Sequence, residues 1–231
     1  DLRFWERVWC NRLVQSSKKA FDIERWRELV RAGNPVSDGD LITLGFDGAQ
    51  FRDAVALVAA HVETGYVWPI GIWEMPHGAD EWQAPAEEID DAGRAAFGRW
   101  NVWRMYADPP YMQAWVAKWQ GEFGDDRVIE WWTNRRKPMT QALEEFETAI
   151  KSGTLSHNGD DVLDRHIANA HRHDLPQLDE NGRPLWLIRK ERPDSPHKID
   201  AAMAAVLAWE ARNDAIAAGA LEEQEAGLFV L

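Results

Sequence analysis

Short apolar runs alternate with amphipathic stretches along most of the chain. Three runs follow one another closely, at residues 41–46, 54–62 and 66–74. Each has the length and apolar content of a buried strand, although the alanines of residues 54–62 leave a helix as the alternative. Thr64-Gly65 between the last two favours a tight hairpin. The pattern therefore predicts an antiparallel meander of three strands.

After Pro85 the pattern changes to alternating helices and strands. Residues 101–108 and 127–132 read as strands, and residues 184–191 as an extra strand. Helical spacing covers the other segments, which are residues 21–33 ending at Gly33, 87–100, 111–121, 137–152, 160–171 and 198–218. The resulting order β-β-β-α-β-α-β-α predicts an α/β fold of ribonuclease H-like type. We expect a mixed sheet of five or more strands, with three antiparallel strands first and helices on both faces.

The simplest organisation is one α/β domain over residues 37–220. Residues 1–36 read as a helical lead-in, and residues 221–231 as a C-terminal tail. No apolar run approaches the roughly 20 residues that a membrane span needs, and the first residues do not resemble a secretory signal. We therefore expect no membrane association.

The amino-acid composition limits the kinds of site that the chain can form. The single cysteine, Cys10, excludes an intrachain disulfide and a cysteine metal cluster. The formal net charge of −13 argues against nucleic-acid binding when taken alone, because phosphate contacts need Lys and Arg. An acidic site that collects cations would add to that charge, and basic residues do group locally at 135–137 and 189–192.

Two predicted strands end in aspartate, at Asp47 and Asp108. If these strands are parallel neighbours, both carboxylates emerge at one rim of the sheet. Asp200, early in the last helix, is the third candidate. Like charges held together repel, and a divalent cation removes that cost. Oxygen-only ligands suit Mg²⁺ or Mn²⁺. Taken singly, each residue has a plainer explanation as a turn or cap residue.

At these residues the chain resembles the nuclease domain of the large terminase subunit of tailed bacteriophages. Four segments carry the resemblance in the order of that family: LGFDGAQFRDAVALV (44–58), MYADPPYMQAWVAKW (105–119), SHNGDDVLDRHIANA (156–170) and HKIDAAMAAVLA (197–208). The resemblance implies endonuclease chemistry with two metal ions, with Asp47, Asp108 and Asp200 as catalytic metal ligands. Asp53 is a further possible ligand, and Ala201 stands where some relatives have a second acid.

The resemblance also implies a biological setting. The substrate would be double-stranded, concatemeric viral DNA, cut during genome packaging in the host cytoplasm. The partners would be a terminase ATPase domain, the small terminase subunit and the portal. No phosphate-binding GxxxxGK[ST] loop occurs in the chain. We therefore expect residues 1–36 to follow an ATPase domain, and this chain to cleave DNA without hydrolysing ATP.

Several further side chains are candidates for binding DNA or supporting the site: Lys198, His157, His166, Asn169, Arg135 and Arg136. His166 and Asn169 are three residues apart and would share a helix face. For His157 and His166 the alternative is a structural role within the domain. His171 and His173 resemble a metal pair, but a solvated helix end is the preferred interpretation.

Two other functions remain open at this stage. One is a transposase, integrase or junction resolvase of the same fold. The other is a non-enzymatic, acidic and Trp-rich phage assembly protein, for which the net charge of −13 is the best support.

Overall fold

The structure, a computed structural model, describes residues 18–33, 35–49, 53–76, 78–79, 81–192 and 195–222. Residues 1–17 of the predicted helical lead-in lie outside the described residues, as does most of the predicted C-terminal tail. Of the helical lead-in, α2 (Ile23–Glu28) is present, with Asp22 as its N-cap. It ends before the predicted Gly33. Trp26 of α2 is fully buried in the main core. The predicted domain boundary at residue 36 stays a prediction.

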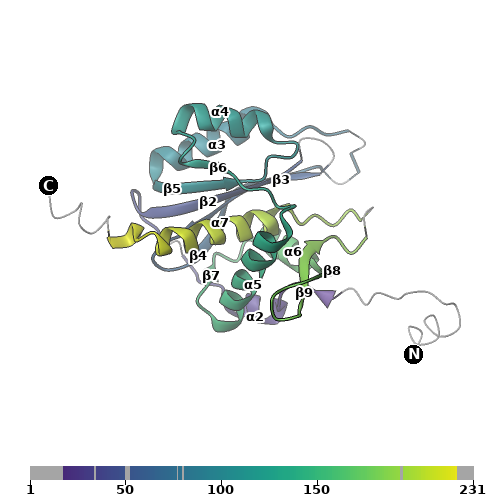
Figure 1. Ribbon diagram of the computed structural model, residues 1–231. Coiled ribbons are helices and arrows are strands. Elements are labelled where there is room, and N and C mark those ends of the chain that lie inside the picture. The colour runs from purple at the N-terminus through teal and green to yellow at the C-terminus, as the bar shows by residue number, and fades with distance from the viewer. Residues whose placement is uncertain are drawn as a thin grey trace, which may run out of the picture.

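A six-stranded mixed sheet forms the centre of the molecule, in the order β6-β5-β2-β3-β4-β7 (Figure 1). β2, β3 and β4 are antiparallel neighbours, β5 and β6 run parallel to β2, and β7 runs parallel to β4. The strands are β2 (Leu41–Gly48), β3 (Ala54–His61), β4 (Tyr66–Glu74), β5 (Asn101–Ala107), β6 (Val128–Glu130) and β7 (Ser156–His157). The predicted meander is confirmed, and residues 54–61 form a strand rather than a helix.

Helices cover both faces of this sheet, as predicted (Figure 1). One face packs on α3 (Ala86–Arg99) and α4 (Gln113–Phe123), around Ile89 and Trp119. The other face packs on α7 (Asp200–Ala217), with α2, α5 (Arg136–Ser152) and α6 (Asp161–Asn169) beside it.

The alternation of β3 explains these two layers. Val55, Leu57 and Ala59 face the α3–α4 layer, whereas Ala56, Val58 and Ala60 face the α7 layer. Successive strand residues point to opposite faces. Alanine at two of the three positions facing α7 lets that helix approach the sheet closely.

A second, three-stranded sheet contradicts part of the sequence prediction. It has the order β1-β8-β9, with β1 (Lys18–Lys19), β8 (His171–Leu178) and β9 (Pro184–Arg189). β9 confirms the extra strand. α6 ends at Asn169, so the helix end predicted at His171 is wrong, and both His171 and His173 belong to β8. Antiparallel pairing with β9 decides the conformation of β8.

Among the described residues, no helix combines the length and the apolar character needed to cross a membrane.

Candidate metal centre

The carboxyl ends of β2 and β5 lie side by side. The two strands are parallel, and Phe46 is in register with Ala107. The Asp108 backbone N–H donates to the Phe46 carbonyl oxygen over 3.0 Å. Asp47 and Asp108 are the next residues on each chain, so both carboxylates emerge at the same rim of the sheet. The prediction that these strands are parallel neighbours is confirmed.

The close approach of α7 to β2 brings Asp200 to that rim. A Cβ on Gly45 would lie 2.0 Å from the Ala204 carbonyl oxygen and 2.4 Å from the Ala208 nitrogen. Thr43 Oγ1 donates to the Ala208 carbonyl oxygen over 2.8 Å. Ala208 thus lies near the earlier part of β2 and Ala204 near the later part. The helix therefore runs antiparallel to β2, and its first residue, Asp200, lies toward the carboxyl end of the strand.

The aspartates share one electrostatic field. Burial raises the pKa of Asp47 well above its usual range, and the charges of Asp200, Asp108 and Asp53 raise it further. Burial, and then the charge of Asp53, raise the pKa of Asp200 to about 7. Burial also raises the pKa of Asp108, against the hydrogen bonds that Thr133 donates to it. The metal-free cluster therefore resists carrying its full negative charge.

Thr133 orients Asp108 from the loop after β6. Its Oγ1 donates to Asp108 Oδ2 over 2.6 Å, and its backbone N–H donates to Oδ1 over 3.2 Å. Asp108 is only 8% exposed. These two bonds fix the orientation of a buried carboxylate that would otherwise have to be desolvated without partners.

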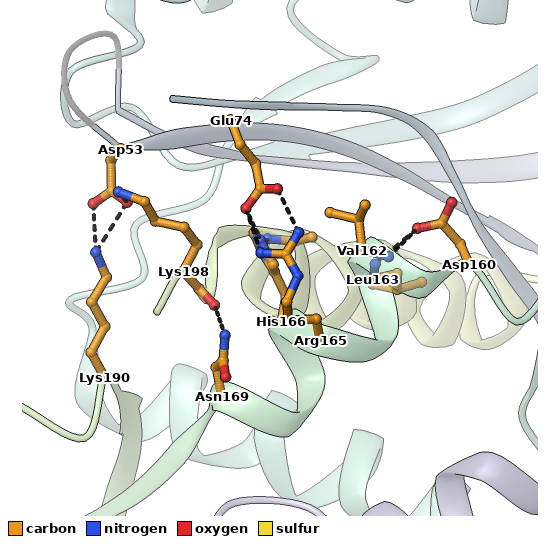
Figure 2. Close-up of polar contacts among 11 residues, drawn as sticks. Asp53, Glu74, Asp160, Val162, Leu163, Arg165, His166, Asn169, Lys190 and Lys198 are labelled. Carbon is orange, nitrogen blue, oxygen red and sulfur yellow. Dashed lines mark hydrogen bonds and ion pairs between the residues drawn. The ribbon is translucent and has the colours of Figure 1, made fainter. Parts of the chain in front are cut away.

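Asp53 lies between two ammonium groups (Figure 2). Lys190 Nζ lies 2.8 Å from one of its carboxylate oxygens and 3.0 Å from the other, and Lys198 Nζ lies 2.8 Å away. Lys190 follows β9, and Lys198 precedes α7. Both positive charges also lower the pKa of Asp200, so they partly neutralise the acidic cluster.

The donor set fits a hard divalent cation. Asp200 Oδ2 is buried and has no hydrogen-bond partner in the described part of the chain. All three central side chains offer carboxylate oxygens, which Mg²⁺ and Mn²⁺ prefer. As the side chains stand, no three His, Cys, Asp or Glu residues among those described are grouped closely enough to hold an ion. The proposal that a cation fits here is therefore supported by the electrostatic repulsion that raises the pKa of Asp47 and by the unpartnered oxygen of Asp200.

The two candidate histidines are structural in this conformation. His157 is fully buried and stacks on Trp26, with ring centroids 3.9 Å apart. His166 is also fully buried. Neither imidazole is exposed to solvent, which favours the structural alternative over a direct contact with DNA. Asn169 donates through Nδ2 to the Lys198 carbonyl oxygen over 3.0 Å, so it supports the chain just before Asp200.

Arg135 and Arg136 remain candidates for DNA contact. Both side chains are exposed at the start of α5, and neither forms an ion pair among the described residues. The preceding loop contains Thr133, so the two guanidinium groups lie on the segment that also holds Asp108.

The sequence alone does not identify Thr133, nor Glu74, whose carboxylate accepts hydrogen bonds from Arg165 and His166. It indicates Lys190 only as part of a basic group. Glu74 ends β4, as Asp47 nearly ends β2, so the position of an acid at a strand end was an available signal. Thr133 and Lys190 lack such a signal, because they act through contacts with distant residues.

An α/β sheet of this order, with carboxylates at the ends of two parallel central strands, defines the ribonuclease H-like class. A family model described as "Terminase large subunit, endonuclease domain" matches residues 82–214, more than half of the chain. The chain belongs to this family.

Two curated relatives agree with this membership. The Gene 13 protein of Mycobacterium phage L5 is 33% identical over an alignment of 189 residues that covers 78% of this chain and 30% of that protein. The Gene 13 protein of Mycobacterium phage D29 is 34% identical over the same shares. The chain thus spans about 30% of the length of the curated relatives it matches.

Solved structures agree on the fold. The large terminase nuclease of thermophilic phage G20c superimposes with a TM-score of 0.59 at 11% identity, covering 83% of this chain and 97% of that one. The same nuclease with bound magnesium gives 0.55 at 13% identity, covering 84% and 97%. The HK97 large terminase gives 0.54 at 15% identity, covering 91% of this chain and 47% of that one. The ribonuclease H-like fold is confirmed.

Proposed function

We propose that this terminase nuclease domain is a divalent-metal-dependent endonuclease that cuts double-stranded, concatemeric viral DNA during genome packaging. The observation that supports it best is that the charges of Asp108 and Asp200 both act on Asp47, at the rim of the sheet where β2 and β5 end. Their mutual repulsion and the unpartnered Asp200 oxygen are features that a bound cation would resolve. Family membership favours this function over a transposase, integrase or resolvase, and over a non-enzymatic assembly role.

Asp47, Asp108 and Asp200 would hold Mg²⁺ or Mn²⁺, with two ions expected and Asp53 as a possible additional ligand. Two such ions supply an activated water and stabilise the leaving oxygen of a phosphodiester. Structures of the G20c nuclease carry magnesium and cobalt, which supports divalent-ion chemistry in this family. Thr133 would keep Asp108 oriented, and Lys190 and Lys198 would hold Asp53. The nucleophile is water, and no covalent intermediate is expected.

The DNA backbone would approach over the loop that leads into α5. Arg135 and Arg136 offer exposed guanidinium groups there, on an otherwise acidic chain of net charge −13. Lys198 is placed against Asp53 and would tune the carboxylate cluster rather than bind a distant phosphate. Because few basic side chains are available to contact the phosphates, this chain alone should bind DNA weakly. Its affinity for DNA should fall as the salt concentration rises.

The remaining parts of the packaging system would be separate. We expect a terminase ATPase domain, the small terminase subunit and the portal as partners, and the host cytoplasm during virion assembly as the setting. This chain alone should not hydrolyse ATP.

A plasmid nicking assay tests the proposal. Wild-type protein should nick supercoiled DNA with Mn²⁺ or Mg²⁺ and stop in EDTA, and Asp47→Ala should lower the rate by at least about 100-fold. Asp125→Ala is the matched control, because Asp125 is an exposed acid in the turn before β6, at the opposite end of that strand from the rim. Nicking that persists in EDTA, or equal rates for Asp47→Ala and wild type, would overturn the proposal.

A further inference from the structure

The polypeptide around Asp200 is held from both sides by α6. On one side, Asn169 Nδ2 donates to the Lys198 carbonyl oxygen over 3.0 Å. On the other side, the Ala201 backbone N–H donates to His166 Nδ1 over 2.9 Å. Figure 2 shows His166 and Asn169 on one face of α6, with Asn169 directed at Lys198. Asp200 lies between these two anchored backbone groups.

The contact from His166 has no substitute within α7. The N-cap residue Ile199 provides no side-chain hydrogen bond to the helix start. The N–H groups of Ala202 and Met203 both donate to the Ile199 carbonyl oxygen. The first N–H groups of a helix have no partner within it. Ala201 is fully buried, so its N–H is shielded from bulk water and has the imidazole as its acceptor.

A second carboxylate fixes the imidazole. Since Nδ1 accepts a hydrogen bond, the ring proton is on Nε2, which donates to Glu74 Oε1 over 2.9 Å. Arg165 holds Glu74 in turn, through a bidentate pair of 2.6 and 3.1 Å (Figure 2). A chain of contacts therefore leads from β4, through α6, to the first turn of α7.

We infer that His166 is a positioning residue for Asp200, oriented by Glu74, and that it sets how well the carboxylate cluster captures a divalent cation. This inference rests on the proposed function, since it assigns Asp200 to a metal site. His166 does not touch the ion or the DNA. It fixes the start of α7, and thereby the place where the Asp200 carboxylate enters the cluster.

Two conservative variants distinguish the effects of the two hydrogen bonds that the His166 imidazole forms. His166→Asn keeps an acceptor at the Nδ1 position and loses the reach to Glu74. His166→Gln keeps a donor at the Nε2 position and loses the acceptor for Ala201. Mn²⁺ affinity, measured by titration calorimetry on the 231-residue chain, should fall roughly 10–100-fold in His166→Gln and His166→Ala. His166→Asn should retain most of the affinity.

His157→Ala is the matched control, because His157 is equally buried but packs on Trp26. It should lower the melting temperature and leave Mn²⁺ affinity unchanged. Equal losses of affinity in His157→Ala and His166→Ala, or unchanged affinity in His166→Gln, would overturn the inference.

A metal-free measurement keeps the inference separate from the proposed function. Hydrogen exchange of the Ala201 amide should be slow in wild type and His166→Asn, and at least about tenfold faster in His166→Gln. If wild type binds Mn²⁺ without nicking DNA, the proposed function fails while the positioning role stands on affinity and exchange. Fast exchange of Ala201 in wild type would reject the positioning role itself.

Discussion

Tyr111 is the one non-glycine residue with a positive φ among those described, at 65°. It lies three residues after Asp108, and 75% of its surface is exposed. A left-handed conformation costs an L-residue other than Gly or Asn about 1–2 kcal/mol, because Cβ crowds the following carbonyl. An exposed ring gains little packing to offset that cost. Strain of this kind concentrates at functional sites, and here it lies beside the carboxylate rim.

Replacing Tyr111 with Asn should therefore stabilise the protein. Asn tolerates this conformation, so we expect the free energy of unfolding to rise by about 1 kcal/mol. Urea denaturation of the metal-free protein measures the change. Tyr111→Ala removes the ring but keeps Cβ, so it should give no such gain. A gain in the alanine variant equal to that of Tyr111→Asn would show that the ring, and not the backbone, carries the strain.

At the level of single residues, the sequence predicts the acidic residues of the site better than the polar groups that form hydrogen bonds around the site. Asp47 and Asp108 are recognisable because they follow apolar runs, and strand ends are where sites form. Thr133 is separated from Asp108 by 25 residues, and Glu74 from His166 by 92. A polar residue at such a distance carries no local periodicity that marks its partner. Only the folded chain shows which polar groups meet.

Gly45 makes the packing of α7 on β2 possible. A Cβ at this position would meet backbone atoms of α7, at 2.0 Å from the Ala204 carbonyl oxygen. Backbone cannot move aside as a flexible side chain can. The helix is buried over most of its surface and rich in alanine, as a helix lying this close to a sheet must be.

Gly45→Ala should consequently be much more damaging than one added methyl group suggests. We expect a loss of roughly 3 kcal/mol or more in the free energy of unfolding, because α7 must move off the sheet. Gly121→Ala is the control: Gly121 is exposed in α4, and nothing lies within 4 Å of its Cβ position. It should gain about 0.5–1 kcal/mol from helix propensity. Comparable effects of the two substitutions in thermal melts would contradict the close approach of α7.

The elements that follow hydrophobic periodicity are those that the sequence predicts. Five of the six strands of the main sheet, β2 to β6, and α7 coincide with predicted apolar segments, because their burial requires apolar side chains at regular positions. β8 reads HRHDLPQL, which has neither a strand alternation nor a helical stripe. Its pairing with β9 and β1 supplies backbone hydrogen bonds that no local pattern encodes. Tertiary pairing therefore decides this element.

At the scale of the whole molecule, two carboxyls on α7, the buried Asp200 and the partly buried Glu210, have a pKa raised to about 7. One is Asp200, in the carboxylate cluster. The other is Glu210, ten residues later and about 15 Å along the helix axis. Burial raises the pKa of Glu210, followed by the charges of Glu145 and Asp214. Both groups oppose ionisation in the folded state, but only Asp200 belongs to the candidate metal centre.

The sign of the pH effect follows from these shifts. A carboxyl whose pKa is higher in the folded than in the unfolded state favours folding most when it is protonated. That contribution is complete below the unfolded value, near 4, and is lost as the pH rises through about 7. For Glu210, a rise from 4.5 to about 7 corresponds to about 3 kcal/mol. The metal-free protein should therefore melt at a lower temperature at pH 8 than at pH 5.

Divalent cations should restore stability at high pH by neutralising the charge of Asp200, which belongs to the candidate metal centre, but not that of Glu210. At pH 8, Asp200→Asn and Glu210→Gln should each raise the melting temperature of the metal-free protein, because each removes a buried charge. Adding Mn²⁺ should raise it further in wild type and Glu210→Gln, since a ligand that binds only the folded state stabilises it. Asp200→Asn should show little or no Mn²⁺ response. Calorimetric melts with Mn²⁺ and with EDTA provide the comparison, and an equal Mn²⁺ shift in both variants would remove Asp200 from the metal centre.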